Sequence, residues 1–320
     1  MSSHGTSSIS HLTQGSVTAD LPLWGPDSNS VSPSRSQAEL YCKSLATSHY
    51  ENFPVVTWLL PHRYHQPFYN IYAFCRWSDD LGDEINDPAE SLRLLDWWRA
   101  ETLRCFEGAA NHPVFVALLP TIDEYHLDRQ PFLDLISAFE QDQCVTEYQN
   151  FDQLLDYCTR SANPVGRILL RLFDRDDDEN VRLSDSICTG LQLANFWQDV
   201  RRDLEIGRLY LPLEDLRSYG VDFEQFRSED RSDLHETPEF VRMMQFQVER
   251  ARQYLKNGLP LGRRLPGRIG LEIELFARGG LAILDKIAQQ DYRVLTSRPK
   301  LGKRDLFKLS LSLFRRLLSG

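Results

Sequence analysis

Two short stretches of this 320-residue chain place acidic side chains at helical spacing among apolar residues. The first, RWSDDLGDE (76–84), puts Asp79 and Asp83 one turn apart on one helix face, with Asp80 beside them. Like charges at this spacing destabilise a helix, unless the face is solvated or a cation lies there. The stretch therefore predicts either a solvated face or a site for positive charge.

The second stretch is LQLANFWQDVRRDLEIGRLYLP (191–212), in which Asn195, Asp199 and Asp203 follow one another at intervals of four residues. Gln192 extends the same helix face toward the N-terminus. Buried carboxylates cost free energy unless they are paired or bind a metal. Oxygen donors without His or Cys suit Mg2+, which binds through a few carboxylates and the phosphates of a substrate.

Taken together, the two stretches predict two helices that hold two or three Mg2+ ions around a diphosphate. Arginines next to both stretches fit this prediction, because a guanidinium group binds phosphate oxygens in a fork. They are Arg76, Arg201, Arg202 and Arg208. The alternative is that both stretches are solvated helix faces whose carboxylates pair with these arginines.

The elements that must position these residues are helices. Helical periodicity runs from Ser36 almost to the end, and strand signals are scarce, so we predict an all-α fold. We expect a Ser-rich disordered tail over 1–35 and one catalytic domain over 36–320. The predicted helices cover residues 36–48, 66–84, 88–107, 112–124, 129–145, 151–173, 181–204, 238–257, 267–290 and about 303–318.

The composition excludes several classes of protein. A formal net charge of -10 argues against a nucleic-acid partner, whose binding surface would be basic. The six cysteines form no CxxC pair, so we expect reduced thiols and no zinc site. No signal peptide and no run of about 18 apolar residues is present, so we expect a cytoplasmic protein that is peripheral to a membrane at most.

Three long motifs, in order, resemble those of the squalene/phytoene synthase family. IYAFCRWSDDLGDE (71–84) is similar to the first aspartate-rich motif of that family, and 191–212 is similar to the second. FDQLLDYCTRSANPVGRILLRLF (151–173) is similar to the helix between them. The resemblance covers about residues 40–310 and implies a single-domain, terpene synthase-like helical bundle with a central cavity.

Within the family, the chain looks most like the bacterial hydroxysqualene synthases of the hopanoid pathway. The stretches that carry this likeness are HYENFPVVTWLLP (49–61), YCTRSANPVGR (157–167) and FARGGLAILDKI (276–287). Glu51 stands where the family usually has a diphosphate-binding Lys, and the pair Gly279-Gly280 stands where it often has a site-lining Tyr. Glu51 in place of that Lys would weaken a second diphosphate site, which favours an enzyme that handles one diphosphate per turnover.

The resemblance implies that the enzyme converts presqualene diphosphate and water to hydroxysqualene and diphosphate, without NADPH. Mg2+, for which Mn2+ could substitute, would be held by Asp79, Asp83, Asn195, Asp199 and Asp203, with Asp80 in support. Substrate contacts are expected from Asn52, Phe53, Arg76, Val165, Gly166, Gln192, Arg208 and Tyr210. The faces of Phe53, Tyr72, Phe74 and Tyr148 are candidates to stabilise a carbocation, and Glu51, Asn52 or Asn163 to position the water.

Purely structural roles are the alternatives to these assignments. The aromatic residues could be core residues, Arg208 and Tyr210 could anchor a loop, and Pro164 could kink a helix. Among the family's activities, squalene, presqualene diphosphate or phytoene synthase remains open. A catalytically silent helical protein that binds prenyl lipids is the alternative from another class.

Two further stretches carry weaker signals. DRDDDEN (174–180) alternates acidic residues like a calcium loop, but Glu179 stands where Gly is needed, so a solvated turn is expected. RDLFKLSLSLFRRLLSG (304–320) has a wide apolar helix face flanked by basic residues. It predicts either contact with the inner membrane surface or packing on the main domain. Other enzymes of the squalene pathway are possible partners.

Overall fold

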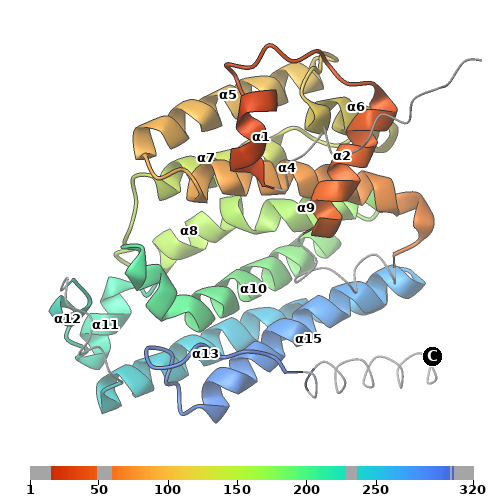
Figure 1. Ribbon diagram of the computed structural model, residues 1–320. Coiled ribbons are helices and arrows are strands. Elements are labelled where there is room, and N and C mark those ends of the chain that lie inside the picture. Colours follow the sequence, from red (N-terminus) through yellow and green to blue (C-terminus); the bar gives the residue numbers. More distant parts are fainter. Residues whose placement is uncertain (1–15, 49–59, 228–235, 303–304, 306–320) are drawn as a thin grey trace, which may run out of the picture. The chain divides into compact units, whose positions relative to one another are not determined.

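The computed structural model describes residues 16–48, 60–227, 236–302 and 305, and its described residues form helices and no named strand (Figure 1). The all-α prediction is therefore confirmed. Contacts along the chain divide it into two compact units, Met1–Cys144 and Val145–Gly320. Whether these units belong to one catalytic domain over 36–320 stays a prediction.

Unit 1 is built from helices of moderate length that alternate with short loops. Its elements are α1 (Val17–Trp24), α2 (Arg35–Ser48), the 3-10 turn η2 (His62–Tyr64), α4 (His65–Asp83), α5 (Pro88–Phe106), α6 (Pro113–Tyr125) and α7 (Gln130–Asp142). Asp87 caps α5 by accepting a hydrogen bond from the backbone of Ala89 at 3.0 Å, and Pro88 opens the helix. This cap follows the sequence prediction.

An aromatic core fixes α4 against α5 in unit 1. Phe74 and Trp77, both fully buried, lie on the side of α4 away from Asp79 and Asp83. Trp77 stacks on Trp98 of α5 with ring centroids 5.2 Å apart, and the indole of Trp98 donates a hydrogen bond to Ser78 at 2.9 Å. Burial of this face holds the first acidic stretch in a fixed orientation.

Part of the expected disordered tail is folded. Residues 17–24 form α1, where Asp20 is fully buried and accepts a hydrogen bond from Tyr41 at 2.8 Å. This segment differs from the disordered tail predicted over 1–35, because a Ser-rich composition gives little sign of a short helix whose buried residues are only Val17 and Asp20. Residues 1–15 lie outside the described part of the chain.

Unit 2 is arranged around one long helix, α10. Its elements are α8 (Phe151–Ser161), α9 (Asn163–Leu172), α10 (Asp178–Glu205), α11 (Leu213–Tyr219), α12 (Glu224–Arg227), α13 (Pro238–Gly258), α14 (Leu261–Arg264) and α15 (Gly267–Gln289). Helices α10, α13 and α15 pack side by side (Figure 1).

Glycines allow this close packing. A Cβ on Gly190 of α10 would lie 2.9 Å from the backbone nitrogen of Leu255 in α13, and one on Gly280 of α15 would lie 2.8 Å from the Leu191 side chain of α10. Side chains at these positions would push the helices apart.

Most predicted helices agree with the structure within a few residues. The exception is 151–173, which is two helices, because Ala162 leaves the helical conformation just before Asn163 and Pro164. The acidic run 174–180 is a turn that starts α10, where Asp177 accepts a hydrogen bond from the Asn180 backbone. The predicted helix near 303–318 lies outside the described residues.

Within the part of the chain that the structure describes, no helix combines the length and apolar character needed to cross a bilayer.

Glu272 of α15 gives a prediction about stability. It is 4% exposed, and neither of its carboxylate oxygens has a hydrogen-bond partner in the described structure. Burial raises its pKa to about 8 from the ordinary 4.5. Between these two values the folded state keeps a proton that the unfolded state has released, so the free energy of unfolding falls as pH rises through this window.

We therefore expect Glu272→Gln to gain stability relative to the native chain, by on the order of 2–4 kcal/mol, as pH rises from about 4.5 to about 8. Urea unfolding at several pH values measures this difference. Glu249→Gln, an exposed change on α13, is the control. A difference between Glu272→Gln and the native chain that does not change with pH would contradict an unpaired carboxyl.

Candidate active site

The first acidic stretch lies along the partly uncovered face of α4. Tyr72 and Asp79 are half-buried and Asp83 is exposed, at spacings of seven and four residues that keep them on one side of the helix. The predicted face therefore exists within unit 1. Burial raises the pKa of the Tyr72 hydroxyl, although Arg76 opposes this effect.

Arg76 neutralises part of this face. Its guanidinium lies 2.7 Å from Asp80, 3.1 Å from Glu84 and 3.8 Å from Asp79. The side chain of Asp80 is only 2% exposed, and its burial raises the pKa to about 7 against the opposing effect of Arg76. Asp80 is therefore a buried partner of Arg76, whereas solvent can reach the carboxylates of Asp79, Asp83 and Glu84.

The second acidic stretch lies on α10 in unit 2. Gln192 is half-buried, Asn195 is exposed, and Asp203 is half-buried near the end of the helix. Asp199 is buried. The residues share one face, as their spacing predicted, although exposure differs from one turn to the next.

A residue that the sequence analysis did not consider contacts this face. Arg298, in the segment after α15, donates from Nε and Nη2 to the two carboxylate oxygens of Asp199. The two residues are 99 positions apart in the chain, and no motif links them. Spacing arguments reach only one or two helical turns, so they could not find this pair.

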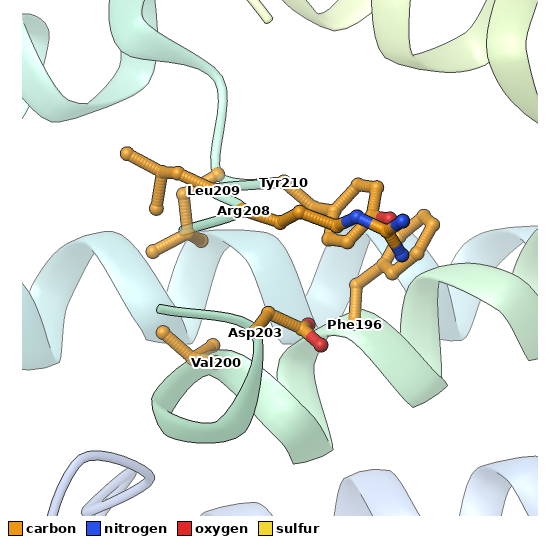
Figure 2. Close-up of a pocket in the computed structure, with 7 residues that line it drawn as sticks. Phe196, Val200, Asp203, Arg208, Leu209 and Tyr210 are labelled. Carbon is orange, nitrogen blue, oxygen red and sulfur yellow. The ribbon is translucent and has the colours of Figure 1, made fainter. Parts of the chain in front are cut away.

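A shallow depression forms where α10 ends and the next segment begins (Figure 2). Its lining residues are Phe196, Val200, Asp203, Arg208, Leu209, Tyr210 and Leu211. The backbone nitrogen of Arg208 donates to the carbonyl oxygen of Asp203 at 2.8 Å, which folds the GRLYLP segment back along the helix. In Figure 2 the Arg208 side chain extends alongside the rings of Phe196 and Tyr210.

Four aromatic rings stand next to the depression. Tyr210 stacks on Phe196 with centroids 3.9 Å apart and on Tyr148 at 5.8 Å, and Tyr157 lies 6.0 Å from Tyr210. The backbone of Leu209 donates to Thr146 at 2.8 Å, so the segments that carry Tyr148 and Tyr210 run together. The structure thus brings together Tyr148, Arg208 and Tyr210, which the sequence analysis selected separately.

Burial and contacts bear on three of the expectations about single residues. Phe74 has no exposed surface and packs in the aromatic core, where it cannot offer its face to a ligand. Asn163 is buried and accepts a hydrogen bond from Thr189 at 3.0 Å, so its oxygen is committed to α10. Gly166 approaches α10 closely, since a Cβ there would lie 2.3 Å from Ser184 Oγ.

Val165, in contrast, is half-buried and keeps part of its surface uncovered. The remaining candidates, Glu51, Asn52 and Phe53, lie outside the described residues, as does most of the C-terminal stretch 304–320. Their roles stay predictions.

The donors suit a hard divalent cation, although the described residues form no cage of carboxylates in advance. Within residues 16–48, 60–227 and 236–302, no three His, Cys, Asp or Glu side chains come close enough to hold a metal ion. Each unit instead offers two carboxylates one turn apart, Asp79 with Asp83 and Asp199 with Asp203. Mg2+ is usually bound in this way, by one or two carboxylates that leave positions for substrate phosphates.

Comparison with known proteins identifies the family of this chain. The family model described as squalene/phytoene synthase matches residues 46–305, which include both acidic stretches and the segment between them. The chain belongs to the squalene/phytoene synthase family. The resemblance inferred from the motifs is thereby confirmed.

Several members of the family are similar over most of the chain. The crystal structure of squalene synthase HpnC from Alicyclobacillus acidocaldarius is 40% identical, with a TM-score of 0.75, and the match covers 81% of this chain and 95% of that one. A hydroxysqualene synthase from Rhodopseudomonas palustris is 30% identical over 79% of this chain and 82% of its own length. A phytoene synthase from Arthrospira platensis is also 30% identical, over 69% and 74%.

The close approach at Gly166 yields a prediction. Gly166→Ala should destabilise unit 2 by about 1–3 kcal/mol, because the new Cβ would meet Ser184 and Cys188 on α10. Gly279→Ala is a matched control, since a Cβ there has no neighbour within 4 Å and Ala favours a helix. Thermal unfolding of both variants measures the difference. Equal melting temperatures would mean that α9 and α10 separate without cost.

Proposed function

We propose that this chain converts presqualene diphosphate and water to hydroxysqualene and diphosphate, with Mg2+ as cofactor. The observation that carries the proposal is the pair of acidic helix faces, each next to an arginine, in a member of the squalene/phytoene synthase family. The likenesses to HpnC, at 40% identity, and to a hydroxysqualene synthase support this branch of the family.

The metal ligands in this proposal are Asp79 and Asp83 of α4 and Asn195, Asp199 and Asp203 of α10. Asp80 supports the first pair by fixing Arg76, which it contacts at 2.7 Å. Bound Mg2+ would supply the positive charge that stabilises the leaving diphosphate. The first step breaks the carbon–oxygen bond, and the bonding electron pair leaves with the diphosphate.

Arg76 and Arg208 bind phosphate oxygens in this mechanism. Both are half-buried next to proposed metal ligands, so their charge is only partly screened by solvent. Tyr210 stacks on Phe196 and Tyr148, which restricts its ring and holds the Arg208 segment in place. Tyr148 is thus assigned a positioning role, because it is only 2% exposed.

The carbocation must then be protected from bulk water. Tyr72, half-buried on the acidic face of α4, can offer its ring to the cation, a contact worth about 0.5–2 kcal/mol. Gln192 and Val165, also half-buried, are proposed contacts for the substrate in unit 2. One water molecule then forms the new carbon–oxygen bond and releases a proton, so no NADPH is consumed.

A second activity has an observation in its favour. The phytoene synthase from Arthrospira platensis is as similar in sequence as the hydroxysqualene synthase, so condensation of two prenyl diphosphates is the rival reaction. We place either reaction in the cytoplasm, with stretch 304–320 as a candidate contact to the inner membrane surface and other squalene-pathway enzymes as candidate partners.

The test is incubation with presqualene diphosphate and Mg2+ in the absence of NADPH, with the product identified by mass spectrometry. We expect hydroxysqualene. Asp79→Asn and Asp199→Asn should each lower kcat by at least about 10²-fold, since each removes a charge that stabilises the transition state. Asp96→Asn, an exposed change on α5, is the control and should leave kcat unchanged.

Two results would count against the proposal. If the chain does not convert presqualene diphosphate but condenses two molecules of farnesyl or geranylgeranyl diphosphate, it catalyses the rival reaction. Full activity in both Asp variants would contradict a metal-dependent mechanism at these two faces.

A further inference from the structure

Arg298 and Asp199 form a bidentate ion pair on the proposed metal-binding face of α10. Both guanidinium donors reach separate carboxylate oxygens, with the Nη2–Oδ2 distance at 2.9 Å. The Asp199 side chain is 12% exposed and that of Arg298 is 33% exposed. The pair is therefore partly shielded from water, where such contacts are stronger than on an open surface.

The segment that carries Arg298 is anchored to α10 on both sides of Asp199. Gln198 donates to the carbonyl oxygen of Pro299 at 2.6 Å, and Arg201 donates to that of Leu295 at 3.0 Å. Glu236 accepts hydrogen bonds from the backbone of Leu295 and from Thr296. These anchors hold the backbone beside the helix whether or not the guanidinium contacts Asp199.

A bound cation and the guanidinium need the same atoms. A carboxylate ligates Mg2+ through the lone pairs of its oxygens, and a bidentate arginine engages both oxygens at once. We propose that Arg298 is a positioning residue. Its guanidinium binds both carboxylate oxygens of Asp199 while no metal is bound and releases them when Mg2+ binds. This proposal rests on the proposed function, because it takes Asp199 as a metal ligand.

Arg202 shows why the effect is specific to Arg298. It lies one turn from Asp199 on the same helix, at 3.8 Å, with 65% of its side chain exposed. It contributes positive charge near Asp199, but at 3.8 Å it makes no hydrogen bond to the carboxylate. Removing Arg202 lowers the local positive charge by the same amount as removing Arg298, but it leaves the contact between Arg298 and the Asp199 carboxylate in place.

The first experiment measures Mn2+ affinity without substrate, by electron paramagnetic resonance of free Mn2+. We expect Arg298→Gln to bind Mn2+ about tenfold more tightly than the native chain, because its competitor is gone. Arg202→Gln is the matched control and should stay within about twofold. Unchanged or weaker binding in Arg298→Gln, or an equal gain in both variants, would overturn the proposal.

The second experiment uses the native chain, so it does not depend on a variant that folds. The Nε–H signal of Arg298 is followed by NMR after labelling with ¹⁵N-arginine, and it is assigned by its loss in Arg298→Lys. We expect Mg2+ to shift this signal and speed its exchange with solvent. A signal that stays unchanged while Mg2+ binds would show that the ion pair between Arg298 and Asp199 persists, which would overturn the proposal.

The two proposals can fail separately. If Asp199→Asn binds Mn2+ as well as the native chain does, Asp199 is no metal ligand, and both this inference and the assignment of Asp199 under the proposed function are wrong. If Asp199→Asn loses affinity and hydroxysqualene is formed, but Arg298→Gln behaves like Arg202→Gln, only the exchange is wrong.

Discussion

Repulsion between carboxylates one helical turn apart is the constraint on which the rest of this structure depends. Each acidic face needs a nearby positive charge to offset this repulsion, and in each unit an arginine from a different part of the chain supplies it. In α4 the charge comes from Arg76, on the same helix as the acids. In α10 it comes from Arg298, in a segment far along the chain.

The opposite sides of these helices make the acidic faces rigid. Trp77 and Trp98 stack behind the first face, while Gly190 and Gly280 let α10 lie close to its neighbours behind the second. Binding groups mounted on such helices keep their positions better than groups on loops. Packing of the apolar side of each helix is therefore what keeps the acidic side in position.

The sequence predicted what depends on local spacing. The helices, the all-α class and the shared face of Asn195, Asp199 and Asp203 follow from a period of 3.6 residues. It could not predict the partner of Asp199, because contacts between distant segments leave no periodic trace. The sequence left the burial of Phe74 open for a related reason: an aromatic residue next to a motif can belong to either side of the helix.

The two adjacent glycines of α15 give the chain room for divergence. Gly280 is fixed by its contact with Leu191, whereas a Cβ on Gly279 would meet nothing within 4 Å. A larger residue at Gly279 would change the surface of the helix without moving the helix itself. A mutation at Gly279 would change which molecules fit against α15 with little effect on the stability of the fold. Specificity can therefore diverge at this position without loss of folding.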